Sequence, residues 1–224
     1  MLSEWEPRFE QFAAQSMGEH AAPHSSSDAA HDLAHIRRVV ANARWLAGEE
    51  GADLAVVLPA AWLHDCVVLP KDSARRSEAS RLAAGAAGAF LRRAGYPVGL
   101  IPAVEHAIAA HSFSAGIPPQ TLEARVVQDA DRLDALGAIG IARTLLLGGT
   151  MGKPLYHPDE ALPQSRPPDE GAYVIDHFYT KLLKLADMMH TAAGRREGER
   201  RTRLMRVYLN ELAREINGRE PAPE

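Results

Sequence analysis

The sequence predicts an all-α fold, and three observations support this prediction. The chain of 224 residues is 46% hydrophobic and 6% aromatic, and it is rich in Ala, Leu and Arg, residues that favour helices. Apolar residues recur every three or four positions in several segments, as one buried helix face requires. No run of residues is convincing as a β-strand. The length suits one compact domain with a substantial core.

The first predicted helix opens the chain and ends at Gly18. Its apolar face consists of four residues at helical spacing, namely Trp5, Phe9, Phe12 and Met17. Residues 20–28 are loop-like and contain three consecutive Ser residues. We therefore expect residues 1–28 to form an N-terminal helix and loop.

The second predicted helix runs from about Ala29 to Glu50, with Ser27 or Asp28 as its N-cap. One broad stripe of this helix carries His31, His35, Val39, Trp45 and Leu46. Two histidines four residues apart can face the same way, but many helices contain such pairs at the surface or as caps, without a metal ion. The pair alone is therefore weak evidence for a metal site.

The third predicted helix, from Asp53 to Leu69, is largely apolar and is stopped by Pro70. His64 and Asp65 lie side by side near its C-terminal end. Burying a polar group without a partner costs about 2 to 7 kcal/mol, and burying a charge costs more. A cation would compensate that cost, with further ligands from other segments. A hydrogen-bonded core pair is the alternative.

A fourth helix is predicted from Ser73, a suitable N-cap, to about Ala94. Three basic residues gather at its start, namely Lys71, Arg75 and Arg76. Most charge clusters of this kind are solvated loops or helix faces. The alternative is a cradle for phosphate, assisted by the N-terminal amides of the helix. The sequence leaves both interpretations open.

Two further helices carry candidate residues. The helix from about Gly99 to His111 contains His106 and His111, which point in different directions, so that each is expected to be structural when taken alone. The helix from Glu123 to Leu147 has an apolar pattern that three acids interrupt, namely Asp129, Asp131 and Asp134. We expect Asp131 to be a buried acid, and the other two to act as caps or ion-pair partners.

The C-terminal third begins with residues 148–172, which are dense in Gly and Pro and are expected to form a long surface loop. Its GGTMGK segment is not a phosphate-binding loop, because a Pro follows the Lys where Ser or Thr is needed. Two helices separated by Gly194 are predicted from Tyr173 to Asn217, followed by a tail at residues 218–224. The last helix has an apolar face formed by Leu204, Val207, Leu209, Leu212 and Ile216.

Charge and cysteine content limit the possible partners and location. The formal net charge of -4 provides no global basic surface for nucleic acid or an anionic membrane. The single Cys66 excludes an internal disulfide, fits a reducing cytosol and is expected to be a small core residue. No apolar run approaches the roughly 18 residues of a membrane span. We expect a soluble, cytoplasmic monomer or homodimer that binds neither nucleic acid nor membrane.

The candidate residues together resemble the H...HD...D signature of the HD-domain metal-dependent phosphohydrolases. In this chain the signature consists of His35, the dyad His64-Asp65, and Asp131 within DADRLD. Shorter segments are similar to a small bacterial subgroup that includes nucleoside triphosphate pyrophosphohydrolases, and these are HDxxH at 31–35, PKxSxxR at 70–76, AHS at 110–112 and DHFYTKL at 176–182. The resemblance extends from about His31 to Asn217.

The resemblance implies a single all-helical HD domain over residues 29–217 and one divalent ion held by His35, His64, Asp65 and Asp131. Two imidazoles and two carboxylates suit Mn²⁺, Fe²⁺, Mg²⁺, Co²⁺ or Ni²⁺ better than a closed structural zinc site. Two coordination positions would remain for a phosphate oxygen and for a water of lowered pKa. A second ion, bound with the help of His106 and His111, is a further possibility.

The same resemblance implies hydrolysis of a nucleotide, most specifically of a nucleoside triphosphate to release pyrophosphate. Lys71, Arg76, His106 and His111 are the candidate substrate contacts. Lys71 and His111 would also neutralise charge that develops during the reaction, and Asp131 would orient or deprotonate the water. No carboxylate follows the dyad to act as a general acid. The alternatives are a phosphodiesterase or alarmone hydrolase, and a sensor that binds nucleotide without hydrolysing it.

Overall fold

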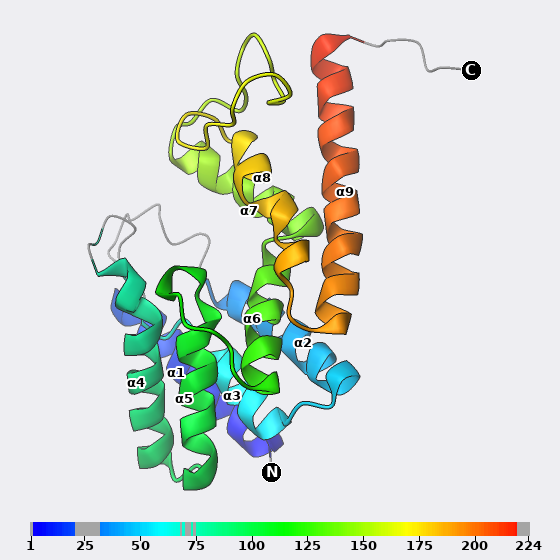
Figure 1. Ribbon diagram of the computed structural model, residues 1–224. Coiled ribbons are helices and arrows are strands. Elements are labelled where there is room, and N and C mark those ends of the chain that lie inside the picture. Colours follow the sequence, from blue (N-terminus) through cyan, green and yellow to red (C-terminus); the bar gives the residue numbers. More distant parts are fainter. Residues whose placement is uncertain (1, 21–31, 68, 70–72, 74, 219–224) are drawn as a thin grey trace. The chain divides into compact units, whose positions relative to one another are not determined.

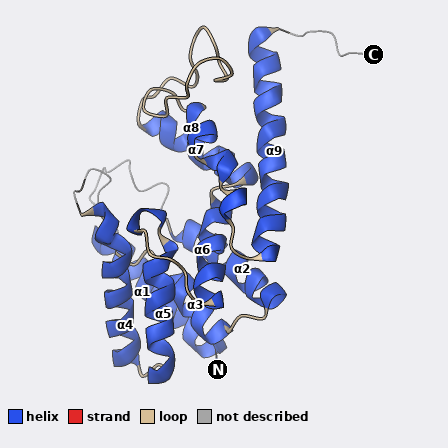
Figure 2. Cartoon of the chain, viewed as in Figure 1, coloured by secondary structure: helices blue, strands red, loops and turns tan. Residues whose placement is uncertain are grey.

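The computed structural model describes residues 2–20, 32–67, 69, 73 and 75–218, and all regular elements within these ranges are helical (Figures 1 and 2). The predicted all-α fold is therefore confirmed. The chain divides into two compact units, each described here by itself: Met1–Arg132 with His190–Gly194, and Leu133–Met189 with Arg195–Glu224. The predicted boundary between residues 28 and 29 lies outside the described residues and stays a prediction.

The first unit contains six α-helices, of which the last extends two residues beyond it. Their bounds are α1 Leu2–His20, α2 Leu33–Glu50, α3 Leu54–Leu63, α4 Ala79–Ala94, α5 Ile101–His111 and α6 Leu122–Asp134. Short 3₁₀ turns lie at Arg76–Glu78, Val98–Leu100 and Phe113–Ala115. Helix α3 packs against α1, α2 and α5, and α4 packs along α5. Every residue of α3 from Val56 onward is buried, so α3 is the central helix of this unit.

Helix α1 has the predicted apolar face, although it ends at His20 and not at Gly18. Phe9 is fully buried. The ring of Trp5 meets Tyr96 edge-on at 4.8 Å between centroids, and Phe12 stacks on Phe90 at 4.2 Å. Nothing is described of the Met17 side chain.

Helix α2 begins at Leu33, later than predicted, because Asp32 is its N-cap. Its carboxylate oxygen Oδ1 accepts the backbone N–H of His35 at 2.7 Å. The predicted caps Ser27 and Asp28 lie outside the described residues. The predicted stripe is wrong for Trp45, which is 42% exposed.

Helix α3 ends at Leu63, six residues before the predicted end at Leu69. The backbone N–H of Cys66 donates to the Leu63 carbonyl at 3.2 Å, which closes a turn directly after the helix. Cys66 is a buried core residue as predicted, and burial raises the pKa of its thiol to about 12. His64 and Asp65 therefore follow the helix and do not lie within it.

Pro59 lies inside α3 and has no N–H to donate to the carbonyl of Ala55, four residues earlier. The hydroxyl of Tyr96 replaces that donor, at 2.5 Å from the Ala55 oxygen. Tyr96 is only 3% exposed, and burial, together with the charge of Asp53, raises its pKa to about 12. A part-buried carbonyl that a proline leaves without its helical donor is thus satisfied by a tyrosine from a distant part of the chain.

The predicted N-cap Ser73 caps a turn and not a helix. Its hydroxyl accepts the backbone N–H of Arg75 at 3.2 Å, a 3₁₀ turn follows at Arg76–Glu78, and α4 begins only at Ala79. Arg75 forms an ion pair with Glu78 at 2.9 Å, whereas the Arg76 side chain is exposed. Lys71 lies outside the described residues.

The predicted helix from Glu123 to Leu147 is wrong as a single element, because it is divided into α6 and α7 (Gly137–Thr150). Gly137 has a φ of +72°, in the left-handed region that side chains disfavour and an α-helix interior excludes. Asp134 is fully buried and forms an ion pair with Arg143, at 2.6 Å. This contact confirms the ion-pairing prediction for Asp134.

The second unit also contains α8 (Asp176–Thr180), two 3₁₀ turns (Leu182–Lys184 and Ala186–Met188) and most of α9 (Ala192–Asn217). The predicted surface loop begins after Thr150, and residues 151–175 have no regular helix. Hydrogen bonds within this segment and to the start of α8 fix the loop. Arg166 donates to the buried Asp176 at 2.7 Å, and the backbone N–H of Val174 donates to the Pro154 carbonyl at 3.1 Å.

The last predicted helix pair differs from the structure at two points. Gly194 does not break a helix but lies in the first turn of α9, whereas the preceding apolar segment forms only one short α-helix and 3₁₀ turns. The predicted face of α9 is wrong for Leu204 and Val207, which are 43% and 64% exposed. Leu209 is buried as predicted, and Thr202 and Met205, which the predicted face did not include, are also buried.

Asp129 anchors the start of α9 to α6. Fully buried, its carboxylate accepts the backbone N–H groups of His190 at 3.0 Å and of Thr191 at 2.7 Å, and the Thr191 hydroxyl at 2.8 Å. A Cβ at Gly194 would lie 2.6 Å from Asp129 Oδ2, so only glycine fits there without displacement. Asp129 is therefore a hydrogen-bond acceptor for the residues before α9 and not its cap, because the Thr191 hydroxyl accepts the backbone N–H of Gly194 at 3.0 Å.

Among the described residues no single helix is both long and apolar enough to cross a membrane. By length and composition alone, α6 and α7 meet that criterion only when they are joined across the break between them.

We expect Asp129→Ala to lower the free energy of unfolding by roughly 2 to 4 kcal/mol, because it leaves buried donors without an acceptor. Urea denaturation followed by circular dichroism measures the loss. Asp129→Asn, which retains one carbonyl oxygen, should lose less. The exposed Asp187→Ala is the matched control and should change stability by less than about 0.5 kcal/mol. A loss for Asp129→Ala as small as that of the control would contradict the anchoring role.

We expect Tyr96→Phe to cost about 0.5 to 1.5 kcal/mol, because the part-buried Ala55 carbonyl loses its donor. The folded-state pKa of Tyr96 is raised above the ordinary value of about 10, so its protonated form stabilises the fold below pH 10 and this contribution is lost as the pH rises toward 12. The stability difference between wild type and variant, measured by urea denaturation, should therefore shrink over that interval. A difference that stays constant would show that the tyrosine does not titrate as proposed.

Candidate metal centre

Two histidines of the first unit lie at helix C-termini, and this position fixes their rings. His64 directly follows α3, and His111 is the last residue of α5. The last four carbonyls of a helix have no partner within the helix. His64 Nδ1 donates to the Ala61 carbonyl at 2.8 Å, and His111 Nδ1 donates to the Ile108 carbonyl at 2.7 Å. Because a carbonyl only accepts, each neutral ring carries its proton on Nδ1 and a lone pair on Nε2.

The remaining residues of the cluster come from three positions in the chain. His35 lies in the first turn of α2 and is only 1% exposed. Asp65 follows His64 in the turn after α3, and Asp131 lies in the last turn of α6. The side chains of Asp65 and Asp131 are 16% and 29% exposed, so the two carboxylates form the accessible side of the cluster.

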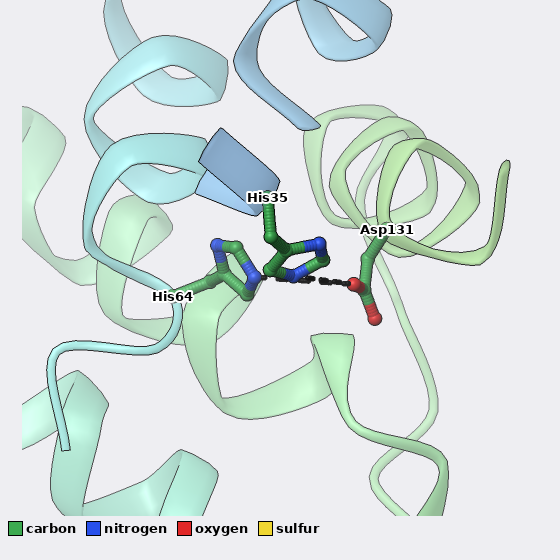
Figure 3. Close-up of side chains that lie close together, drawn as sticks. All are labelled: His35, His64 and Asp131. Atoms are coloured by element: carbon green, nitrogen blue, oxygen red, sulfur yellow. Dashed lines mark ion pairs between the residues drawn. The ribbon is translucent and has the colours of Figure 1, made fainter. Parts of the chain in front are cut away.

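These side chains converge on a small volume. The Nε2 atom of His35 lies 3.5 Å from Asp131 Oδ1 and 3.8 Å from Asp65 Oδ2. The Nε2 atom of His64 lies 3.5 Å from Asp65 Oδ2 and 3.9 Å from Asp131 Oδ1. Figure 3 shows the rings of His35 and His64 turned toward the Asp131 carboxylate. The structure thus brings together all four residues that the sequence nominated as metal ligands.

The environment of His64 fits a cation. Burial lowers the pKa of this fully buried ring despite the nearby carboxylates, so His64 is neutral at pH 7 and its approach to Asp65 is not a salt bridge. Its Nε2 is buried and accepts no hydrogen bond within the described part of the chain. A lone pair directed at carboxylate oxygens is repulsive unless a positive charge lies between them. Two atoms each about 2.1 Å from one ion are about 3.0 to 3.5 Å apart, which is close to the separations observed.

His111 is the fifth member of the cluster. Its Nε2 lies 3.5 Å from Asp65 Oδ1, the carboxylate oxygen other than the one facing His64. Burial alone would lower the pKa of His111, but its hydrogen bond to Asp65 and the charge of Asp65 outweigh burial and raise the pKa. The ligand atoms form two overlapping groups that could hold a metal ion, His35–His64–Asp131 and His64–Asp65–His111. His111, expected to be structural when considered alone, therefore lies at this site.

Other nominated residues lie elsewhere. His106 accepts the backbone N–H of Gln120 at 3.1 Å through Nε2 and does not belong to either group of ligand atoms. Asp131 is not the buried acid that we expected, because the fully buried acids of that helix are Asp129 and Asp134. Asp32 accepts the backbone N–H of His35 and caps its helix.

One buried polar residue beside the site escaped the sequence reasoning. Gln128, 3% exposed, donates through Nε2 to the Ala110 carbonyl at 2.6 Å. Its position between Val127 and Asp129, in an apolar stretch, was the available signal. A glutamine inside such a stretch needs a partner, but only the tertiary structure names it.

Comparison with known proteins places this geometry in a family. The HD domain model matches residues 32–136, a range that contains all five residues of the cluster. The Bacillus subtilis protein YpgQ is 34% identical over 194 residues, which cover 84% of this chain and 85% of YpgQ.

Solved structures agree in fold. The crystal structure of Bacillus subtilis YpgQ in complex with ADP is similar with a TM-score of 0.71 and 32% identity, covering 95% of this chain and 98% of YpgQ. An HD-superfamily hydrolase from Bacillus thuringiensis is similar with a TM-score of 0.74 and 31% identity, covering 98% of this chain and 100% of the other. The chain therefore belongs to the HD-domain family and has the fold of the HD-superfamily hydrolases.

Proposed function

We propose that this chain is a divalent-metal-dependent phosphohydrolase that converts (deoxy)nucleoside triphosphates into nucleoside monophosphates and pyrophosphate. The observation that carries the proposal is the buried lone pair of His64, which faces two carboxylates at 3.5 and 3.9 Å. A nucleotide substrate is supported by the relative YpgQ, whose structure was solved in complex with ADP.

In this proposal His35, His64, Asp65 and Asp131 hold the ion. Their mixed nitrogen and oxygen atoms suit Mn²⁺ and the similar ions Mg²⁺, Fe²⁺, Co²⁺ and Ni²⁺. When bound, the ion lowers the pKa of a water molecule and withdraws charge from a phosphate oxygen. Asp131, the more exposed of the two carboxylates, orients the water.

The geometry favours one ion. The two groups of ligand atoms share His64, whose Nδ1 is committed to the Ala61 carbonyl. The single remaining lone pair on Nε2 serves one ion only. A second ion would have to be held by His111 and the far oxygen of Asp65 without a further histidine.

The overall reaction adds the oxygen of water to the α-phosphorus and breaks the bond from this phosphorus to the bridging oxygen, which leaves with pyrophosphate. His111 is placed to stabilise charge on the departing oxygens. The turn Arg76–Glu78 packs against the turn Phe113–Ala115, which follows His111, and this packing supports the proposal that Arg76 contacts phosphate. Lys71 and His106 remain proposed substrate contacts, without support from the described residues.

Calorimetric titration of ion-free protein with Mn²⁺ should show one ion per chain. His64→Ala and Asp65→Ala should each weaken binding at least about a hundredfold, because removal of a ligand also leaves the other buried polar groups without compensation. His157→Ala, which alters a histidine of the 151–175 loop, is the control and should bind normally. Wild-type affinity in both ligand variants would refute the site, and two ions per chain would refute the single-ion geometry.

A panel of nucleotides with Mn²⁺ should show release of pyrophosphate, and not orthophosphate, from triphosphates. Asp65→Ala should abolish this turnover while circular dichroism still shows a folded helical protein. Arg76→Ala should raise KM about tenfold, the effect of losing one charge-assisted hydrogen bond to phosphate. Arg81→Ala, an exposed arginine of α4, is the matched control. Orthophosphate release, cleavage of a cyclic or tetraphosphate nucleotide alone, or binding without turnover would each replace the proposed activity.

A further inference from the structure

The last turn of α5 is held by side chains at three consecutive carbonyls. His111 Nδ1 donates to the Ile108 oxygen at 2.7 Å, Ser80 Oγ to the Ala109 oxygen at 2.9 Å, and Gln128 Nε2 to the Ala110 oxygen at 2.6 Å. These carbonyls belong to the helix end, where partners within the helix are lacking. Each therefore receives its hydrogen bond from a different side chain.

The two donors other than His111 come from separate helices. Ser80 belongs to α4 and Gln128 belongs to α6, and both residues are only 3% exposed. Ala110 is fully buried, so water cannot readily replace the Gln128 donor, and the bond from Ser80 to the Ala109 carbonyl is part-buried. A buried carbonyl left without a donor would be costly, which means that the two side chains hold the end of α5 in one position.

The orientation of the Gln128 amide is itself fixed. Its oxygen Oε1 lies 2.6 Å from His190 Nε2, and its nitrogen donates to the Ala110 carbonyl. Gln128 also lies three residues before Asp131, so both point from neighbouring positions on α6. The helix that supplies one carboxylate of the metal centre thus also holds the helix end that carries His111.

We propose that Ser80 and Gln128 are positioning residues that act through His111. They form a clamp, defined as these two side chains with the Ala109 and Ala110 carbonyls, that stops the end of α5 from fraying. While both of these hydrogen bonds are formed, the ring of His111 keeps its hydrogen bond to the Ile108 carbonyl and its direction toward Asp65. The clamp follows from the hydrogen-bond geometry alone, whereas its effect on turnover rests on the proposed function.

The first test observes the ring and needs neither metal nor substrate. Side-chain ¹⁵N–¹H spectra of the ion-free protein should show His111 with its proton held on Nδ1. In Ser80→Ala/Gln128→Leu that signal should shift and exchange faster, whereas the His64 signal stays unchanged. Tyr96→Phe, which also removes the donor to a backbone carbonyl of this unit, is the control for general loss of stability and should leave His111 unchanged. An unchanged His111 signal in the double variant would overturn the proposal.

The second test measures turnover. The double variant should lose at least about tenfold in kcat with KM within about twofold, because a small displacement of a group that acts on the reaction lowers the rate more than binding. In a His111→Ala background the same two substitutions should have no further effect on kcat. An equal loss in both backgrounds would show a structural role only. If the wild type hydrolyses no nucleotide, the proposed function fails, and the ring spectra still decide whether the clamp exists.

Discussion

The site depends on where two helices end. Because α3 stops at Leu63 and α5 at His111, the carbonyls of Ala61 and Ile108 are available to accept an imidazole proton. In a helix interior the backbone N–H four residues later would occupy them. The ends of these helices therefore fix a proton on Nδ1 of both rings and leave each Nε2 directed at a carboxylate. These helix ends therefore orient the imidazoles of the candidate metal centre.

Buried polar groups around the site serve the same purpose from farther away. Asp32 fixes the first turn of α2, which carries His35. Asp129 holds the residues that lead into α9 against α6, the helix that carries Asp131. Asp32 accepts a backbone N–H within the first turn of its helix, where such donors lack partners, and Asp129 accepts those of the two residues before α9. The helices of the first unit are thus fixed at the ends that carry the ligands.

Sequence reasoning succeeded where local pattern alone decides the outcome. Helical periodicity gave the fold class, and the incompatibility of His64 and Asp65 with an apolar environment singled out the site. It failed at element boundaries. The sequence predicts that Pro70 stops the third helix and that Gly194 separates the last two, yet α3 ends at Leu63 and Gly194 lies within α9. A glycine is needed at position 194 because a Cβ there would lie too close to the Asp129 carboxylate. Leu204 and Val207 have helical spacing, but whether they are buried depends on tertiary packing.

The amino-acid sequence by itself determined that the chain is helical, because helical periodicity is a local property of the chain. Its resemblance to the HD-domain signature indicated which four side chains could bind a metal ion. Only the tertiary structure decided that His111 lies beside these four residues and His106 does not, and that Asp129 and Asp134 are buried while Asp131 is accessible. It also decided that Ser80 and Gln128 donate hydrogen bonds to the last turn of α5. The physical reason is that a hydrogen bond between distant segments depends on where helices end and how they pack. Neither property is encoded in any single stretch of residues.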